Sequence, residues 1–143
     1  MEILIICPVN PTEDINKVGE ALENLLDRSD FTTINNDDDD VLHLSTTYTN
    51  RDAVNLVRQT IHETRIIDAA RKRLRLNWNG TTTKIYFDKQ AAFVRKLRII
   101  DDHLELPPLG SIEMVLTFNS EEEFEEFVNW FTPPTKDGKV INH

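Results

Sequence analysis

The sequence has few of the residues that mark secreted, membrane-bound or glycine-rich proteins. Among its 143 residues there are one cysteine and four glycines. The single cysteine, Cys7, cannot form an internal disulfide, which fits the reducing cytoplasm. No apolar run is long enough to cross a bilayer, and no charged-then-apolar leader opens the chain. We therefore expect a cytoplasmic protein with no membrane partner.

Motifs for catalysis and for bound cofactors are also missing. The sequence has no glycine-rich phosphate loop, no paired cysteines and no serine in a nucleophile elbow. Its four histidines lack the spacing of metal ligands. Residues 37–40 are consecutive aspartates, whereas a calcium-binding EF-hand loop alternates its ligands, so a solvated loop is the better interpretation. We predict no catalytic residues, no metal, no cofactor and no small-molecule substrate.

Positive charge is concentrated in the middle of an acidic chain. The net charge is −9, yet residues 51–100 hold twelve of the sixteen Lys and Arg residues and four acids, a net of +8. The flanks, residues 1–50 and 101–143, carry −9 and −8. Either the acidic flanks neutralise this basic segment within the fold, or the segment binds an anionic partner such as RNA.

Apolar periodicity predicts one α+β domain over residues 1–134. Alternating apolar residues predict strands at residues 3–9, 31–35, 42–48, 82–87, 93–100 and 112–118. Helical spacing predicts helices at residues 12–27, capped by Thr12, and 121–131, capped by Ser120. We expect a mostly antiparallel sheet with these helices packed on one face. Residues 135–143 should form a mobile C-terminal tail.

Two features of the predicted fold can be checked residue by residue. The side chains expected beneath the helices are those of Ile85, Phe87, Leu97, Met114 and Leu116. Between residues 51 and 76 two apolar sets fall on opposite sides of a continuous helical wheel. A straight helix would expose one set, so we predict that the chain bends or breaks near Glu63.

The basic segment also supplies a candidate RNA-binding surface. If residues 82–87 and 93–100 pair as a hairpin, its open face carries a positively charged and aromatic set, namely Lys84, Tyr86, Lys96 and Arg98. Single-stranded nucleic acid needs charge for its phosphates and a ring for stacking. Lys89 in the turn and the helical Arg58 and Arg65 complete the candidate set. Glu113, on the next strand, could instead neutralise these bases across the sheet.

Several segments resemble the pattern of a small archaeal family of uncharacterised proteins. They are residues 58–71 (RQTIHETRIIDAAR), 88–92 (DKQAA), 8–14 (PVNPTED), 109–110 and Trp130. The resemblance covers residues 3–134. The chain departs from the family pattern in the aspartate run and at Asp88, where asparagine is usual.

The resemblance implies a ribosomal-protein-like fold, similar to the large-subunit protein that binds 5S ribosomal RNA, and members that form homodimers. The family is sometimes described as a predicted exosome subunit, and it has no established active site. Its motifs contain a polar cluster, Asp68, Arg71 and Gln90. An enzyme would use Asp68 and Gln90 together with Lys89, although the spacing of Asp68 and Arg71 suits a structural ion pair. We expect a non-enzymatic, RNA-associated protein; the alternative is a dimeric protein-interaction module without RNA affinity.

Overall fold

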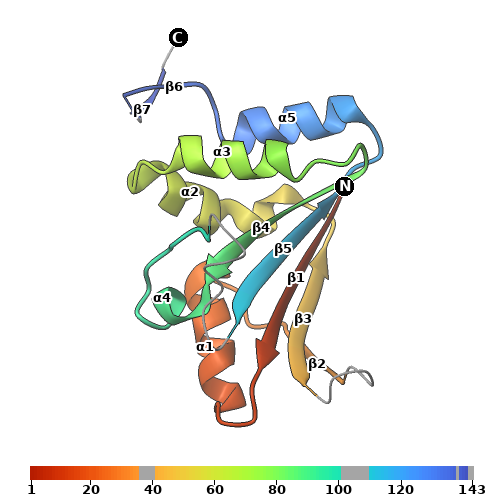
Figure 1. Ribbon diagram of the computed structural model, residues 1–143, viewed down its shortest axis with the longest axis vertical. Helices are drawn as coiled ribbons and strands as arrows, with labels where there is room; N and C mark the ends of the chain where they lie inside the picture. Colours follow the sequence, from red (N-terminus) through yellow and green to blue (C-terminus); the bar gives the residue numbers. More distant parts are fainter. Residues whose placement is uncertain (36–40, 101–109, 138, 142–143) are drawn as a thin grey trace.

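The strand β1 lies in the middle of a five-stranded antiparallel sheet (Figure 1). The computed structural model describes residues 1–35, 41–100, 110–137 and 139–141. Within them the strands are β1 (Glu2–Val9), β2 (Thr32–Asn35), β3 (Leu42–Tyr48), β4 (Thr82–Asp88) and β5 (Ser111–Thr117), in the spatial order β2-β3-β1-β5-β4. The aspartate run at residues 37–40 and the motif residue Leu109 lie outside the described residues.

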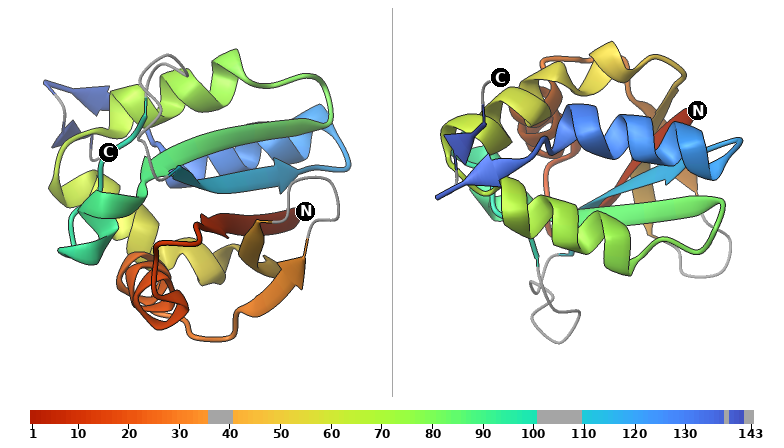
Figure 2. Two further views of the ribbon diagram at one scale, coloured as in Figure 1. Left: turned by 60° about the horizontal axis from the view of Figure 1, so that its bottom comes forward. Right: turned by 90° about the horizontal axis from the view of Figure 1, so that it is seen from above.

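The described helices all pack on the same face of the sheet (Figures 1 and 2). They are α1 (Ile15–Leu26), the 3-10 helix η1 (Arg51–Val54), α2 (Asn55–Glu63), α3 (Ile67–Leu76), α4 (Lys89–Phe93) and α5 (Glu121–Phe131). Seen from above, α5 lies between α2 and α3 (Figure 2, right). The predicted fold class is therefore confirmed. Two short strands, β6 (Thr135–Lys136) and β7 (Lys139–Val140), follow α5; the mobility of this tail stays a prediction.

Alternation along the strands separates a buried face from an open one. On β1 the side chains of Ile3 and Ile5 are at most 1% exposed and enter the helical layer, whereas Leu4 and Ile6 on the other face are half-buried. Burying one such side chain stabilises the fold by about 1.5–3 kcal/mol. The same pattern on β4 and β5 buries Ile85 and its neighbours beneath the helices, so the core forms between one face of the sheet and the helices.

The predicted break in the helical segment is confirmed. Helix α2 ends at Glu63 and α3 begins at Ile67. Between them Arg65 adopts a left-handed backbone conformation with φ 59°. The change of direction allows Ile61 and Ile67, on the two helices, to be completely buried.

The second strand of the predicted hairpin is wrong. Residues 89–93 form α4 because the Asp88 side chain accepts a hydrogen bond from the Gln90 backbone N–H and so caps a helix immediately after β4. The chain then touches β4 again through one bridge, between Phe87 and Ile99. Leu97 is consequently half-buried rather than buried.

The predicted cap of α1 is also wrong, since Asp14 and not Thr12 accepts the capping hydrogen bond.

Candidate nucleic-acid interface

The second face of the sheet is not covered by any helix in the described part of the chain. Two rows of directly paired residues cross it: Thr47, Leu4, Val115 and Lys84 in one row, and Ser45, Ile6, Glu113 and Tyr86 in the other. The apolar members at the centre are half-buried, while Lys84 is exposed at the β4 edge. We call the set Leu4, Ile6, Val115, Lys84 and Tyr86 the open face.

Lys84 and Tyr86 form the charged and aromatic part of the open face. The Lys84 ammonium lies 5.8 Å from the centroid of the Tyr86 ring. Interaction with the Tyr86 hydroxyl raises the pKa of Lys84; burial opposes this, and the Glu113 carboxylate adds a smaller increase. Glu113 lies directly opposite Tyr86 on β5, but it makes no ion pair with Lys84 within 4.0 Å among the described residues. Lys84 therefore keeps its charge available for a phosphate.

The structure brings Arg98 to the end of the same edge. Backbone hydrogen bonds on either side of the Phe87–Ile99 bridge join Asp88 to Arg98 and Tyr86 to Ile100. The Arg98 guanidinium pairs with the Asp88 carboxylate at 3.1 Å, and its side chain remains 53% exposed. Lys96 is exposed two residues earlier. Thus Lys84, Tyr86 and Arg98 share the β4 edge although the predicted hairpin does not form.

Lys89 lies away from this surface and is completely buried. Its ammonium donates hydrogen bonds to the Pro8 carbonyl at 2.7 Å and to Glu13 Oε1 at 2.8 Å. Glu13 also accepts from the backbone and side-chain N–H groups of Asn10, at 3.0 and 2.9 Å. A lysine held in this way cannot reach a phosphate, so the assignment of Lys89 to the RNA-binding surface is corrected.

Three of the motif segments meet around this buried ion pair. Glu13 belongs to the segment 8–14 and Lys89 to the segment 88–92. Gly110 adopts φ +90°, and a Cβ added to it would lie 2.8 Å from Cγ of Pro8. These segments, which are far apart in the sequence, therefore meet in space. We call the set Pro8, Asn10, Glu13, Lys89 and Gly110 the buried junction.

The central motif, residues 58–71, holds the carboxyl end of α5. Arg58 Nε donates to the Trp130 carbonyl at 2.7 Å, and His62 Nε2 lies 2.9 Å from the Phe131 carbonyl. Arg71 donates through Nε to the Thr132 carbonyl at 3.1 Å and through Nη2 to the next carbonyl, that of Pro133. Cations stabilise the carboxyl end of a helix because the last carbonyls carry partial negative charge. Much of this motif is therefore structural.

The remaining motif residues do not form a single site. Asp68 pairs with Arg71 at 3.1 Å and accepts a hydrogen bond from Thr135, so these two α3 residues connect α3 to the segment that follows α5. Gln90 is exposed on the first turn of α4, and Arg65 is exposed in the turn between α2 and α3. The structure therefore separates Gln90 from Asp68 and Arg71, and separates Arg58 and Arg65 from the open face.

Ion pairs between described residues neutralise the basic segment in part. Two of them join it to the acidic flanks: Lys89 with Glu13 at 2.8 Å, and Arg75 with Glu125 at 2.8 Å. Two others, Arg71 with Asp68 and Arg98 with Asp88, use acids of the segment itself. Of these four ion pairs between described residues, the acidic flanks therefore supply the carboxylates of two.

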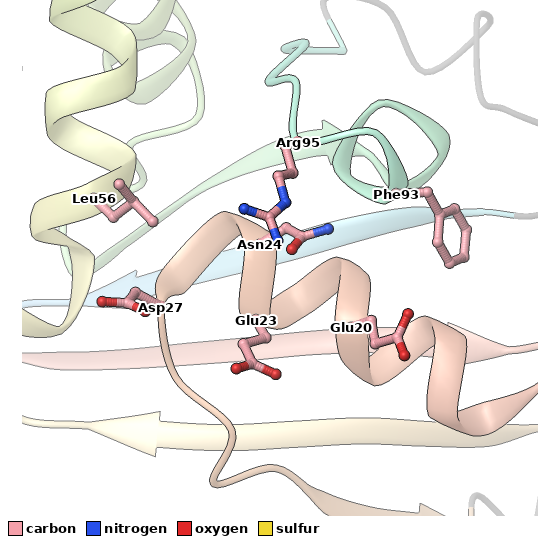
Figure 3. A pocket seen from close by; sticks show the side chains of 7 residues that line it. All are labelled: Glu20, Glu23, Asn24, Asp27, Leu56, Phe93 and Arg95. Atoms are coloured by element: carbon pink, nitrogen blue, oxygen red, sulfur yellow. The ribbon is translucent and has the colours of Figure 1, made fainter.

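A hollow of about 440 Å³ lies on the helical side, lined by Glu20, Glu23, Asn24, Asp27, Leu56, Phe93 and Arg95 (Figure 3). It contains none of the residues predicted for RNA binding, and its three carboxylates would repel a phosphate backbone.

The described residues include no group of three or more His, Cys, Asp or Glu side chains arranged to hold a metal. Likewise, none of the described helices combines the length and apolar character needed to span a membrane.

Comparisons with known proteins connect this geometry to one family. A family model described as RNA binding matches residues 2–118. A UPF0201 protein from Sulfurisphaera tokodaii is 33% identical over 144 residues, covering 96% of this chain and 90% of that protein. One from Saccharolobus solfataricus is 31% identical over 140 residues, covering 96% and 91%. The crystal structure of a UPF0201 protein from Methanococcus jannaschii superposes with a TM-score of 0.81 at 27% identity, covering 99% of this chain and 100% of that one.

Proposed function

The chain belongs to the archaeal UPF0201 family and matches a family model described as RNA binding, and from this premise we propose that it is a non-enzymatic, RNA-associated cytoplasmic protein. One structural observation supports the proposal most directly. An antiparallel sheet leaves one face free of the described helices, and its β4 edge carries an exposed lysine and arginine on either side of an aromatic ring.

The open face suits single-stranded RNA better than a duplex. Unpaired bases can stack on Tyr86 and pack on the half-buried Leu4, Ile6 and Val115, which a duplex with its bases stacked inside could not do. Lys84 and Arg98 would then bind phosphates along the β4 edge, with Lys96 beyond them. An overall charge of −9 does not prevent this, because the nearest phosphates respond mainly to charges within a Debye length of about 8–10 Å.

The proposal is tested by the salt dependence of RNA affinity. If four or five phosphates are contacted, the logarithm of affinity should fall with the logarithm of salt concentration at a slope of about −3. Lys84→Gln combined with Lys96→Gln should flatten that slope by about 1.4, since each lost phosphate contact removes about 0.7. Fluorescence anisotropy with a labelled single-stranded oligonucleotide at low salt measures both slopes.

A matched control removes the same charge elsewhere. Lys17 on α1 and Lys136 on β6 are exposed, and Lys17→Gln with Lys136→Gln should leave the slope close to that of the wild type. No binding at tens of micromolar protein would reject RNA association and favour the protein-interaction module. Equal slopes for both double variants would reject the open face as the binding surface.

We further propose that the protein is a homodimer, on the strength of the family resemblance. Sedimentation equilibrium across a concentration series gives the mass directly. A mass that stays at the monomer value of 16.6 kDa up to tens of micromolar would contradict the proposal.

A further inference from the structure

Two arginines on the helical side share one aromatic ring. Arg51 begins η1 and Arg58 follows seven residues later on α2, so that both guanidinium groups reach Trp130 near the end of α5. Their Cζ atoms lie 4.7 and 5.0 Å from the centroid of the indole ring. Both distances are within the range of cation–π attraction, which holds the two side chains in place.

The two arginines keep unused hydrogen-bond donors. Arg58 donates its Nε–H to the Trp130 carbonyl at 2.7 Å. Its terminal nitrogens make no hydrogen bond to a described residue, and neither does the guanidinium group of Arg51. No carboxylate of the described residues lies within 4.0 Å of either guanidinium. Asp52, the next residue after Arg51, lines a different hollow together with Arg28.

Holding two positive charges on one ring is unfavourable without a counter-charge. Burial and, after it, the charge of Arg51 both lower the pKa of Arg58. An anion close to both guanidinium groups would relieve this repulsion and could accept hydrogen bonds from their terminal N–H groups. Guanidinium groups present pairs of N–H donors whose spacing matches the oxygens of a phosphate.

We propose that Arg51 and Arg58, held against Trp130, form a binding site for a phosphate group. The site goes beyond the open face, because it lies in the helical layer and shares no residue with the open-face set. The phosphate can come from an RNA backbone or from free inorganic phosphate, since both present the same oxygens.

The first experiment titrates the ¹⁵N-labelled full chain with inorganic phosphate and follows the indole N–H resonances by NMR. The Trp130 signal should shift saturably, whereas Trp78, whose ring stacks on Phe124 at 3.9 Å, serves as the internal reference. Arg51→Gln should weaken the phosphate affinity about tenfold or more, because a charge-assisted hydrogen bond is lost. The variant should fold normally, since Arg51 is exposed and donates no hydrogen bond to a described residue.

Lys72→Gln is the matched control, because Lys72 is exposed on α3 and carries the same charge. It should bind phosphate like the wild type. A Trp130 signal that does not move at tens of millimolar phosphate overturns the proposal, and so does an equal loss of affinity in the Arg51 and Lys72 variants.

A second titration uses a single-stranded RNA oligonucleotide that lacks terminal phosphates. It shows whether the bound phosphate comes from an RNA backbone or from free inorganic phosphate. If RNA shifts the Trp130 signal and Arg51→Gln abolishes that shift, the ligand is a backbone phosphate; if inorganic phosphate alone shifts it, the ligand is free phosphate. Both results support the site. The variant with Lys84→Gln and Lys96→Gln separates the two proposals, because it should keep the phosphate response of Trp130 even where binding at the open face is lost.

Discussion

At the scale of single residues, Lys89 and Glu13 form an ion pair with side chains 0% and 8% exposed. Removing one partner leaves the other as an uncompensated buried charge. Lys89→Met should therefore lower the free energy of unfolding by about 3–5 kcal/mol, measured by urea unfolding at neutral pH. One carboxylate oxygen of Glu13, Oε2, is already buried without a hydrogen bond among the described contacts. Losing the hydrogen bond from Lys89 would therefore leave the carboxylate still less well satisfied.

The double variant Lys89→Met with Glu13→Leu provides the control for that prediction. It removes both charges, and buried ion pairs replaced by apolar groups are often neutral in stability. It should thus unfold at a higher urea concentration than Lys89→Met alone. Should the double variant prove as unstable as the single one, the loss would come from packing rather than from the unpaired carboxylate.

The same pair makes stability depend on pH. Burial alone would raise the pKa of Glu13, but hydrogen bonds from Lys89 and Asn10 outweigh it and lower the pKa below its ordinary value of 4.5. A carboxyl group whose pKa is lower in the folded state stabilises the fold fully above its unfolded pKa. We expect this stabilisation to be lost as the pH falls from 4.5 toward the lowered value, and the loss to be smaller in the double variant.

The burial of Lys89 could not be predicted from the sequence. Lysine is usually exposed, and residue 89 follows a strand in what periodicity presents as a polar turn. The partner that compensates its charge lies 76 positions away, and local patterns carry no signal for that meeting. Arg51 and Arg58 differ in this respect. Their seven-residue spacing indicates a shared helical face, although not the tryptophan against which they lie.

At the scale of elements, side chains of α2 on one side and of α3 on the other make hydrogen bonds to α5 and to the residues that follow it. Arg71→Gln would remove the charge-assisted hydrogen bonds to the Thr132 and Pro133 carbonyls. We expect a cost of about 1.5–3 kcal/mol. Amide hydrogen exchange should accelerate in the last turn of α5 and leave β1 unchanged, because β1 contacts neither carbonyl.

Arg75→Gln is the comparison, because Arg75 also joins α3 to α5 but does so through the Glu125 side chain. Arg75 makes two hydrogen bonds to Glu125, at 2.8 and 2.9 Å, but both side chains are more than 40% exposed. Exposed ion pairs contribute about 0.2–1 kcal/mol, so this variant should change exchange in α5 much less. Faster exchange in the Arg75 variant than in the Arg71 variant would show that the exposed ion pair, rather than the capped carbonyls, fastens α5.

Elements with strong periodicity were predicted well, and short ones were not. The apolar stripe of α5, the Ser120 cap and the phase change near Glu63 each carry a local signal, and the structure contains all three. Helix α4 has five residues, too few for a helical period to show. The alternation of Phe93, Leu97 and Ile99 resembled a strand, whereas the capping carboxylate of Asp88 starts a helix instead.

At the scale of the whole molecule, the alternation of apolar and polar residues on β4 predicts that one face of the sheet is open, whereas β1, which is apolar on both faces in the sequence, carries no such signal. The candidate site was predicted in part. Lys84 and Tyr86 alternate with buried residues on a strand, and the structure places them on the open face. Arg98 reaches the same edge by a bridge that no local pattern indicates. Tertiary packing, which no local pattern shows, decides which helical arginines donate hydrogen bonds to the carbonyls at the end of α5.

The central position of β1 has a consequence for synthesis on the ribosome. β1 pairs with β3 on one side and with β5, residues 111–117, on the other. The nascent chain must therefore emerge past residue 117 before the second edge of β1 is fully paired, and past Gly110 before the buried junction is complete. Long-range pairing of this kind slows folding and leaves a strand edge exposed in the meantime. We expect chains truncated before residue 110 to aggregate or to require a chaperone, whereas release of the whole chain should let the sheet close in one cooperative step.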